Sequence, residues 1–266
     1  MKKMLAATAA AVLLLFTFFT VFPQREESGG KVKIGTPDDT GGMIIHYLIN
    51  EKGFQGAEAR DDFEIYPVKD CCSSTSQWAL STGQYNLAVM CPDAAASLIE
   101  KDGRFEIAGP CLANSDIVVV KPGLTPRKIG VARNRSHQAQ IAADIFGKGC
   151  AAVPMLPSAL PYAYEKSAVD GVVVDALRGI SMEGEKLSAG GATGHVTYVL
   201  VVSKRFKEDP RYREFISLFR ESVDELNNPD ILRKEIGRYK NIELSQEEIE
   251  TWNRLGIRYI FTTPEM

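Results

Sequence analysis

The chain has 266 residues, of which 45% are apolar and 24% are charged, and its formal net charge at pH 7 is −3. This length suffices for one large core or for two lobes, and the composition is that of a globular protein rather than of a disordered chain. With 31 basic against 34 acidic residues and no basic stripe, nucleic-acid binding has no electrostatic support.

An apolar run stands near the start of the chain. Lys2 and Lys3 precede the run from Leu5 to Phe22, and polar residues follow it up to Gly30. This pattern predicts an export signal that delivers the rest of the chain outside the cytoplasm. Because the run is about as long as a minimal membrane span of roughly 18–20 residues, residues 1–30 are interpreted either as a cleaved signal peptide or as a retained anchor with its linker.

Short apolar runs then alternate with amphipathic segments. Strands are predicted at residues 31–35, 63–68, 87–91 and 105–108, with helices at 43–49, 76–81 and 93–101. Such alternation predicts an α/β architecture with mostly parallel strands.

The same alternation restarts after an extended segment at 116–120. Strands are predicted at 128–132, 151–155 and 171–175, helices at 136–146 and 160–166, a return strand at 197–202, and three closing helices at 210–226, 230–239 and 246–255. The predicted organisation is therefore lobe 1 at 31–120, lobe 2 at 121–194, and a return crossing with C-terminal helices that pack on both lobes at 195–266.

Two stretches of lobe 1 carry a family resemblance. Lys33–Pro37 and the run Ala79–Ala88 resemble the strand, Ser/Thr-rich turn and A-L-x-x-G-x-x-D-x-A pattern of periplasmic solute-binding proteins, above all those serving nitrate, sulfonate, taurine or thiamine-precursor ABC transporters. Ile129–Val131 and Ala168–Val173 are similar to the second-lobe strands of that group. Asn86 stands where the family usually has Asp.

This resemblance implies a periplasmic-binding-protein type II fold, with two α/β lobes, hinge crossings and a central cleft. It also implies a monomeric extracytoplasmic protein that works with an ABC transporter permease in the membrane, without a cofactor. Cys71-Cys72-Ser73 replaces the usual Gly-Ser-rich turn and resembles a narrower branch, the selenocysteine-assisted organometal systems. That branch implies an organomercury or another thiophilic ligand.

The cysteines also point to thiol chemistry without any resemblance. Cys71 and Cys72 precede a predicted helix start, where free N–H groups and the helix dipole favour thiolate, a ligand for soft metals. Cys91 and Cys111 are predicted at carboxyl strand ends on the cleft side, and Cys150 at the opposite side. The expected metal ligands are Cys71, Cys72 and Cys91. A vicinal disulfide at the pair, and simple packing of Cys91 and Cys111, remain open alternatives.

Other cleft loops offer further candidate ligand-binding residues. Thr36, Thr40 and Gly41 belong to a loop whose N–H groups can meet an anion or carboxylate, or which is simply a turn with a cap at Thr40. Ser73 lies in the cysteine turn. In lobe 2, Arg135 and His137 start a helix and Asp175 ends a strand, so all three are expected near the cleft.

The expected function is capture of a soft metal or organometal cation for a membrane permease. A sulfonate-like or heterocyclic solute bound by the loops from Thr36 to Gly42 and from Ser73 to Thr75 is the second interpretation. An exported thiol redox enzyme or organometal lyase is a weaker one. An anchored sensor domain would use the same cleft, so the sequence does not distinguish it from a transport component. The chain has no nucleophile elbow and no phosphate-binding glycine loop, so we expect no catalysis.

Overall fold

The computed structural model describes residues 30–52, 63–68, 80–190 and 194–262. Contacts separate Met1–Lys31 from one compact unit, Val32–Met266, which contains the described helices and strands. Within the described ranges, none of the helices is both long and apolar enough to cross a membrane.

A six-stranded sheet forms lobe 1 and has the strand order β11-β4-β10-β3-β1-β2. Its strands are β1 (Val32–Pro37), β2 (Phe63–Val68), β3 (Leu87–Met90), β4 (Phe105–Ala113), β10 (Val196–Ser203) and β11 (Arg258–Tyr259). β1, β2 and β3 are parallel, whereas β10 runs antiparallel to β3 and β4. The chain therefore leaves this sheet after β4 and returns to its middle at β10.

Alternating side chains of β10 pack on both faces of this sheet. Leu200 and Val202 join the apolar cluster beneath α2 (Thr40–Tyr47) and α9 (Arg211–Leu226), whereas Val199 and Val201 join the cluster beneath α4 (Pro92–Lys101). Both faces are covered, which explains why β3 and β10 are apolar at nearly every position.

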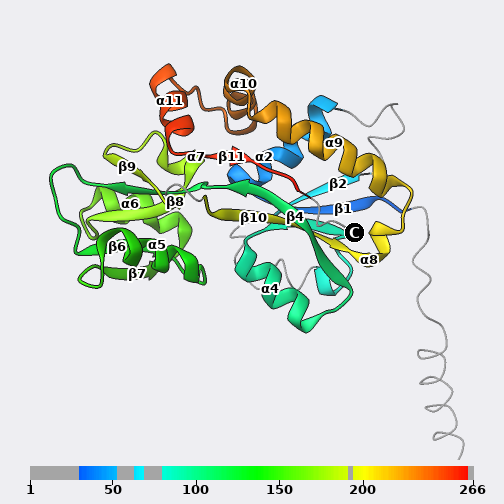
Figure 1. Cartoon of the computed structure of the whole chain (residues 1–266), viewed down its shortest axis with the longest axis horizontal. Coiled ribbons are helices and arrows are strands. Elements are labelled where there is room, and N and C mark those ends of the chain that lie inside the picture. The colour runs from blue at the N-terminus through cyan, green and yellow to red at the C-terminus, as the bar shows by residue number, and fades with distance from the viewer. Residues whose placement is uncertain (1–29, 53–62, 69–79, 191–193, 263–266) are drawn as a thin grey trace, which may run out of the picture. The chain divides into compact units, whose positions relative to one another are not determined.

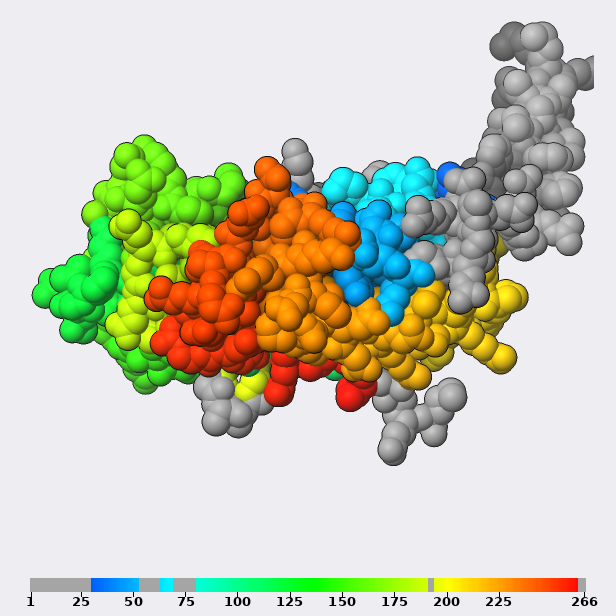
Figure 2. Space-filling view, turned by 90° about the horizontal axis from the view of Figure 1, so that it is seen from above, coloured from blue at the N-terminus to red at the C-terminus, as the bar shows by residue number. Residues whose placement is uncertain are grey.

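Further helices follow the strands of lobe 1. They are η1 (Leu48–Lys52), α8 (Lys204–Lys207), α10 (Pro229–Lys240) and α11 (Gln246–Arg254). Figure 1 shows α9, α10 and α11 in succession along one edge of the fold, and in Figure 2 they cover the middle of the face seen from above, orange to red.

Lobe 2 is built on a five-stranded sheet with the order β7-β6-β8-β5-β9. Its elements are β5 (Asp116–Val120), β6 (Lys128–Ala132), α5 (Ser136–Phe146), β7 (Ala151–Met155), η3 (Pro157–Ala159), α6 (Leu160–Glu165), β8 (Gly171–Asp175), α7 (Ala176–Gly179) and β9 (Glu185–Ser188). β6 is parallel to β7 and β8, and β5 is antiparallel to β8 and β9. The fold is a two-lobe α/β architecture, as expected from the sequence.

Two boundaries differ from the sequence-based expectation. β5, expected as a crossing at the end of lobe 1, pairs with β8 and β9 and so belongs to the sheet of lobe 2. β4 continues to Ala113 rather than ending at Ala108, because it pairs with β10 over most of its length. Cys111 therefore lies inside β4 and not in a loop after it.

Candidate functional site

Polar residues at the carboxyl ends of strands in the two sheets meet each other. Asp39 follows β1 and Asp93 follows β3 in lobe 1, whereas Arg135 follows β6 and Asp175 ends β8 in lobe 2. Open α/β sheets bind ligands outside the carboxyl ends of their strands, so a solute site is expected here. We call the hydrogen-bonded residues at this place the inter-lobe network. Its members are Asp39, Thr40, Asp93, Asp116, Arg135, Ser136, His137, Asp175 and Tyr198.

Asp175 of lobe 2 binds the start of helix α2 in lobe 1. Its Oδ1 accepts from the Thr40 hydroxyl at 2.8 Å, and the Thr40 amide lies 3.2 Å from Oδ1 and 3.3 Å from Oδ2. The same Oδ1 caps α7 by accepting from the Leu177 amide at 3.1 Å. The amides at the start of α2, predicted to meet an anion or carboxylate, thus meet a carboxylate of the protein itself.

Arg135 connects lobe 2 to Asp39 of lobe 1 through a tyrosine of β10. Its Nη2 donates to the Tyr198 hydroxyl at 2.7 Å, and that hydroxyl donates to Asp39 Oδ2. Its Nη1 donates to Asp116 Oδ1 at 2.7 Å. The ring of Tyr198 also packs against the start of α2, where a Cβ added to Gly41 would lie 2.7 Å from the ring. Glycine is therefore needed at position 41 for this close approach.

His137 joins the start of α5 to both lobes. Its Nε2 lies 2.6 Å from Asp116 Oδ2 and its Nδ1 lies 3.4 Å from Asp93 Oδ2. The same Asp93 oxygen accepts from the Ser136 hydroxyl at 2.8 Å. The ring of His195 lies 5.1 Å from that of His137, and its buried Nε2 has no hydrogen-bond partner among the described residues.

Three ionisable groups of the network, Asp116, His137 and Asp175, have shifted pKa values. Burial and the nearby charge of Asp39 raise the pKa of Asp175 to about 8. Burial of Asp116 opposes its ionisation, but the Arg135 charge and the His137 hydrogen bond keep its pKa below the ordinary value. Burial also opposes protonation of His137, yet its bond to Asp116 raises the pKa of the imidazole. The cationic partners, Arg135 and His137, thus contact Asp116, whereas the donors to Asp175 are neutral amides and a hydroxyl.

The structure brings four of the predicted ligand-binding residues into this network, namely Thr40, Arg135, His137 and Asp175. Thr36 is buried in β1, where its hydroxyl donates to the Pro37 carbonyl at 3.3 Å.

Sequence reasoning did not single out the five other members of the network: Asp39, Asp93, Asp116, Ser136 and Tyr198. The strand-end rule that selected Asp175 applies equally to Asp39 and Asp93. Tyr198 sits within an apolar strand and gives no signal of its polar contacts.

The cysteines are only partly described. Cys71, Cys72 and Ser73 lie outside the described residues. Cys91 precedes α4 and is buried in the apolar cluster with Ala94 and Leu98. Burial, and then the charge of Asp39, raise the pKa of the Cys111 thiol well above its usual range. Across the described ranges, no three His, Cys, Asp or Glu side chains gather as a metal site.

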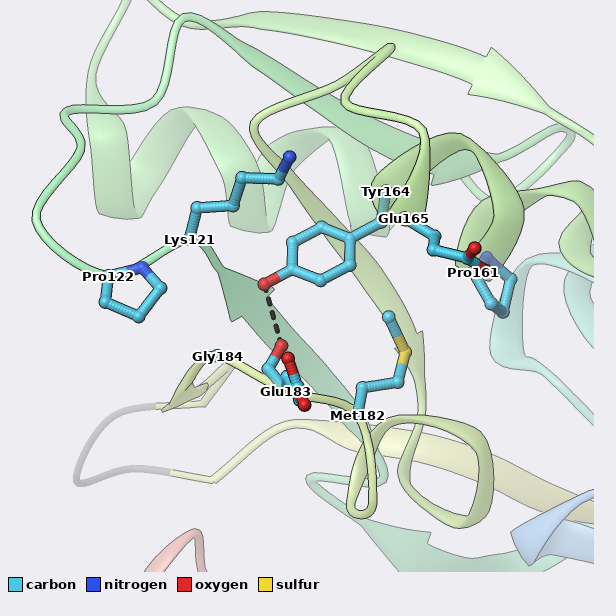
Figure 3. Close-up of a pocket in the computed structure, with 8 residues that line it drawn as sticks. All are labelled: Lys121, Pro122, Pro161, Tyr164, Glu165, Met182, Glu183 and Gly184. Atoms are coloured by element: carbon cyan, nitrogen blue, oxygen red, sulfur yellow. Dashed lines mark hydrogen bonds between the residues drawn. The ribbon is translucent and has the colours of Figure 1, made fainter.

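A pocket of about 540 Å³ lies at the other end of the lobe 2 sheet (Figure 3). Tyr164 projects into it from α6 and donates to the Glu183 carbonyl at 2.8 Å, and Lys121 lies across the pocket from Glu183. Lys121 follows Val120, which pairs with Gly171 at the start of β8, whereas Asp175 ends that strand. This pocket is therefore separate from the inter-lobe network.

No protein-family model and no curated protein matches this sequence. Solved structures share its fold. A ligand-binding component of an ABC-type import system from Staphylococcus aureus, with zinc bound, aligns with TM-score 0.69 and 14% identity over 89% of this chain and 87% of its own. The alkanesulfonate-binding protein from Xanthomonas axonopodis pv. citri bound to MOPS aligns with TM-score 0.63 and 13% identity over 87% and 86%.

A nutrient-binding protein from Burkholderia cenocepacia bound to methionine aligns with TM-score 0.56 and 14% identity over 74% of this chain and 95% of its own. At these identities the likeness concerns the fold alone. The chain has the two-lobe fold of type II periplasmic binding proteins.

Proposed function

We propose that this protein is the extracytoplasmic solute-binding component of an ABC transporter, which captures a solute between its lobes and presents it to a membrane permease. The observation that carries the proposal is the inter-lobe network, in which Asp175 and Arg135 of lobe 2 reach Thr40 and Tyr198 of lobe 1. Such contacts are what two lobes need to close around a solute. The apolar run from Leu5 to Phe22 supports export or anchoring at the outer face of the membrane.

For the solute, we propose a soft metal or organometal cation held by Cys71, Cys72 and Cys91. Thiolates select soft ions, and Cys91 stands two residues before Asp93, which bonds Ser136 across the lobes. The two lobe 1 carboxylates of the network, Asp39 and Asp93, favour a positively charged solute over an anion. Cys111, whose raised pKa keeps it a neutral thiol, is a packing neighbour in this proposal rather than a metal ligand.

A sulfonate-like solute is the second candidate, because one protein of the same fold is an alkanesulfonate-binding protein. An oxyanion at the start of α2 would meet the Thr40 amide, which donates to Asp175. Such a solute would have to displace the Asp175 carboxylate, and Arg135 of the network would offer it a cation.

Calorimetry separates these two candidates. Reduced protein is titrated with Hg(II), methylmercury and a panel of alkanesulfonates, and the titrations are repeated with Cys71→Ser, Cys72→Ser and the double variant. Cys150→Ser is the matched control, since Cys150 opens β7 at the amino end of that strand, away from the network.

We expect tight uptake of the mercury species, with proton release, that the double variant loses and the control retains. Tight sulfonate binding that survives the double substitution, without metal uptake by the parent, would assign the protein to the second candidate. Absence of binding to every probe would contradict both choices of solute.

A further inference from the structure

Asp175 is the direct hydrogen-bond link between the end of β8 in lobe 2 and the start of α2 in lobe 1. Thr40 is fully buried and only 7% of Asp175 is exposed. The 2.8 Å bond between the Thr40 hydroxyl and Asp175 Oδ1 spans 135 positions of the sequence. Because the two residues belong to different lobes, this contact exists only while the two strand ends are together.

Among the residues that the structure describes, the groups that face Asp175 provide little positive charge. Asp39 approaches from the start of α2, and Asp116 is its register partner on β5. Burial raises the pKa of the phenols of Tyr239 on α10 and Tyr259 on β11, and the charge of Asp175 raises it further. Both phenols therefore stay neutral.

The guanidinium of Arg135, in the same network, is already bonded to Asp116 and Tyr198. An ionised Asp175 would therefore be buried opposite a second carboxylate, Asp39, and the donors that the described part of the chain offers it are neutral. Burial of an uncompensated charge of this kind is unfavourable.

We propose that Asp175 is a proton-linked latch, which holds the two lobes together in its protonated form and lets them separate when it ionises. The proposal rests on lobe opening, which the proposed function requires. On closure the carboxylate takes up one proton from solvent. Oδ2 carries that proton, because Oδ1 accepts from the Thr40 hydroxyl and the Leu177 amide, whereas the donor given to Oδ2 is the Thr40 amide at 3.3 Å.

The direction of the pH effect follows from linkage. Burial and Asp39 raise the pKa of Asp175 to about 8 in the closed arrangement, whereas a water-exposed aspartate has a pKa of about 3.9. Between these values, closure binds one proton, so the closing equilibrium weakens by up to about tenfold per unit rise in pH. Above the closed-state pKa it no longer changes with pH. The latch by itself therefore favours the closed arrangement at acidic pH and opening of the lobes at alkaline pH.

Hydrogen exchange of the full chain, without added solute, tests the latch. The probes are peptides containing Thr40 and Leu177, whose amides donate to Asp175, and the reference is β5, whose amides bond within lobe 2. After correction for intrinsic exchange, the parent should lose protection at both probes by up to about tenfold per unit between pH 6 and pH 8, while β5 stays unchanged. Asp175→Asn, a neutral mimic of the acid, should keep its protection at every pH.

Asp39→Asn is a second variant, since asparagine preserves the N-cap of α2 while the charge facing Asp175 is removed. At pH 8 this variant should retain the protection from hydrogen exchange that the parent has lost at both probes. A parent whose protection does not depend on pH, or an Asp175→Asn variant with the parent's pH dependence, would overturn the latch. Neither result bears on solute capture, which the calorimetric titrations measure independently.

Discussion

Arg135 is the residue on which the electrostatics of the inter-lobe network depend most. It is 6% exposed and bonds the fully buried Asp116, while its second amino group reaches Tyr198. Without the guanidinium, Asp116 would keep a buried charge whose remaining partners, within the described ranges, are His137 and Gln138. A buried ion pair of this type adds little net stability, but removal of one partner is strongly destabilising.

Arg135→Met should lower the free energy of unfolding by about 3–5 kcal/mol, because the buried Asp116 carboxylate loses its cation. Denaturant unfolding measures this change. Lys166→Met is the control, since Lys166 pairs with Glu165 at the surface and should change stability by about 1 kcal/mol or less. Equal effects of the two substitutions would contradict the role of Arg135.

At the scale of elements, helix α11 shows how local sequence signals position the C-terminal segment. Ser245 and Glu248 form a reciprocal capping box, with the Glu248 amide 3.2 Å from Ser245 Oγ and the Ser245 amide 2.7 Å from Glu248 Oε2. The helix buries Trp252, and Glu248 also accepts from Ser181 of lobe 2 at 2.5 Å. A four-residue motif therefore fixes a helix that touches lobe 2.

Ser245→Ala should destabilise the protein by about 1 kcal/mol, because one amide at the start of α11 loses its acceptor. Ser245→Asn supplies another good capping side chain and should lose much less. Thermal unfolding compares the variants, and hydrogen exchange at residues 246–250 shows whether the loss is local. If both substitutions were equally harmful, the cap would not be the cause.

At the scale of the whole molecule, hydrogen bonds across the strand ends decide how lobe 2 meets lobe 1. The Thr40 hydroxyl donates to Asp175 and lies 3.3 Å from the Leu177 amide. Thr36 is also a buried threonine of lobe 1, but its hydroxyl bonds only the adjacent Pro37 carbonyl among the described contacts. A comparison of substitutions at Thr40 and Thr36 therefore distinguishes the loss of an inter-lobe hydrogen bond from the loss of a buried hydroxyl.

Thr40→Val keeps the shape of the side chain and removes the inter-lobe hydroxyl. We expect faster exchange at the Leu177 amide, by about fivefold to tenfold if the bond contributes about 1 kcal/mol, with the strands of both sheets unaffected. The matched control Thr36→Val should leave the Leu177 amide as in the parent. Unchanged exchange in Thr40→Val would mean that this hydroxyl does not hold the lobes together.

Much of the fold was predictable from the sequence, because hydrophobic periodicity and strand length are local properties. The predicted strand 171–175 and helix 136–146 coincide with β8 and α5. The elements α7, β9 and β11 were not predicted, since segments of two to four residues are too short to show a period. β5 was placed in the wrong sheet for a different reason: its pairing with β8 depends on residues more than fifty positions away.

The sequence by itself determined the two α/β units and the strand-end positions of Thr40, Arg135, His137 and Asp175, because both follow from patterns along the chain. Only the tertiary structure decided their partners. It placed the Asp175 carboxylate on the start of α2, put Tyr198 of an apolar strand between Arg135 and Asp39, and enclosed Cys111 within β4. Hydrogen bonds and burial join residues that are distant in sequence, and a carboxylate's protonation depends on those neighbours rather than on its place in the chain.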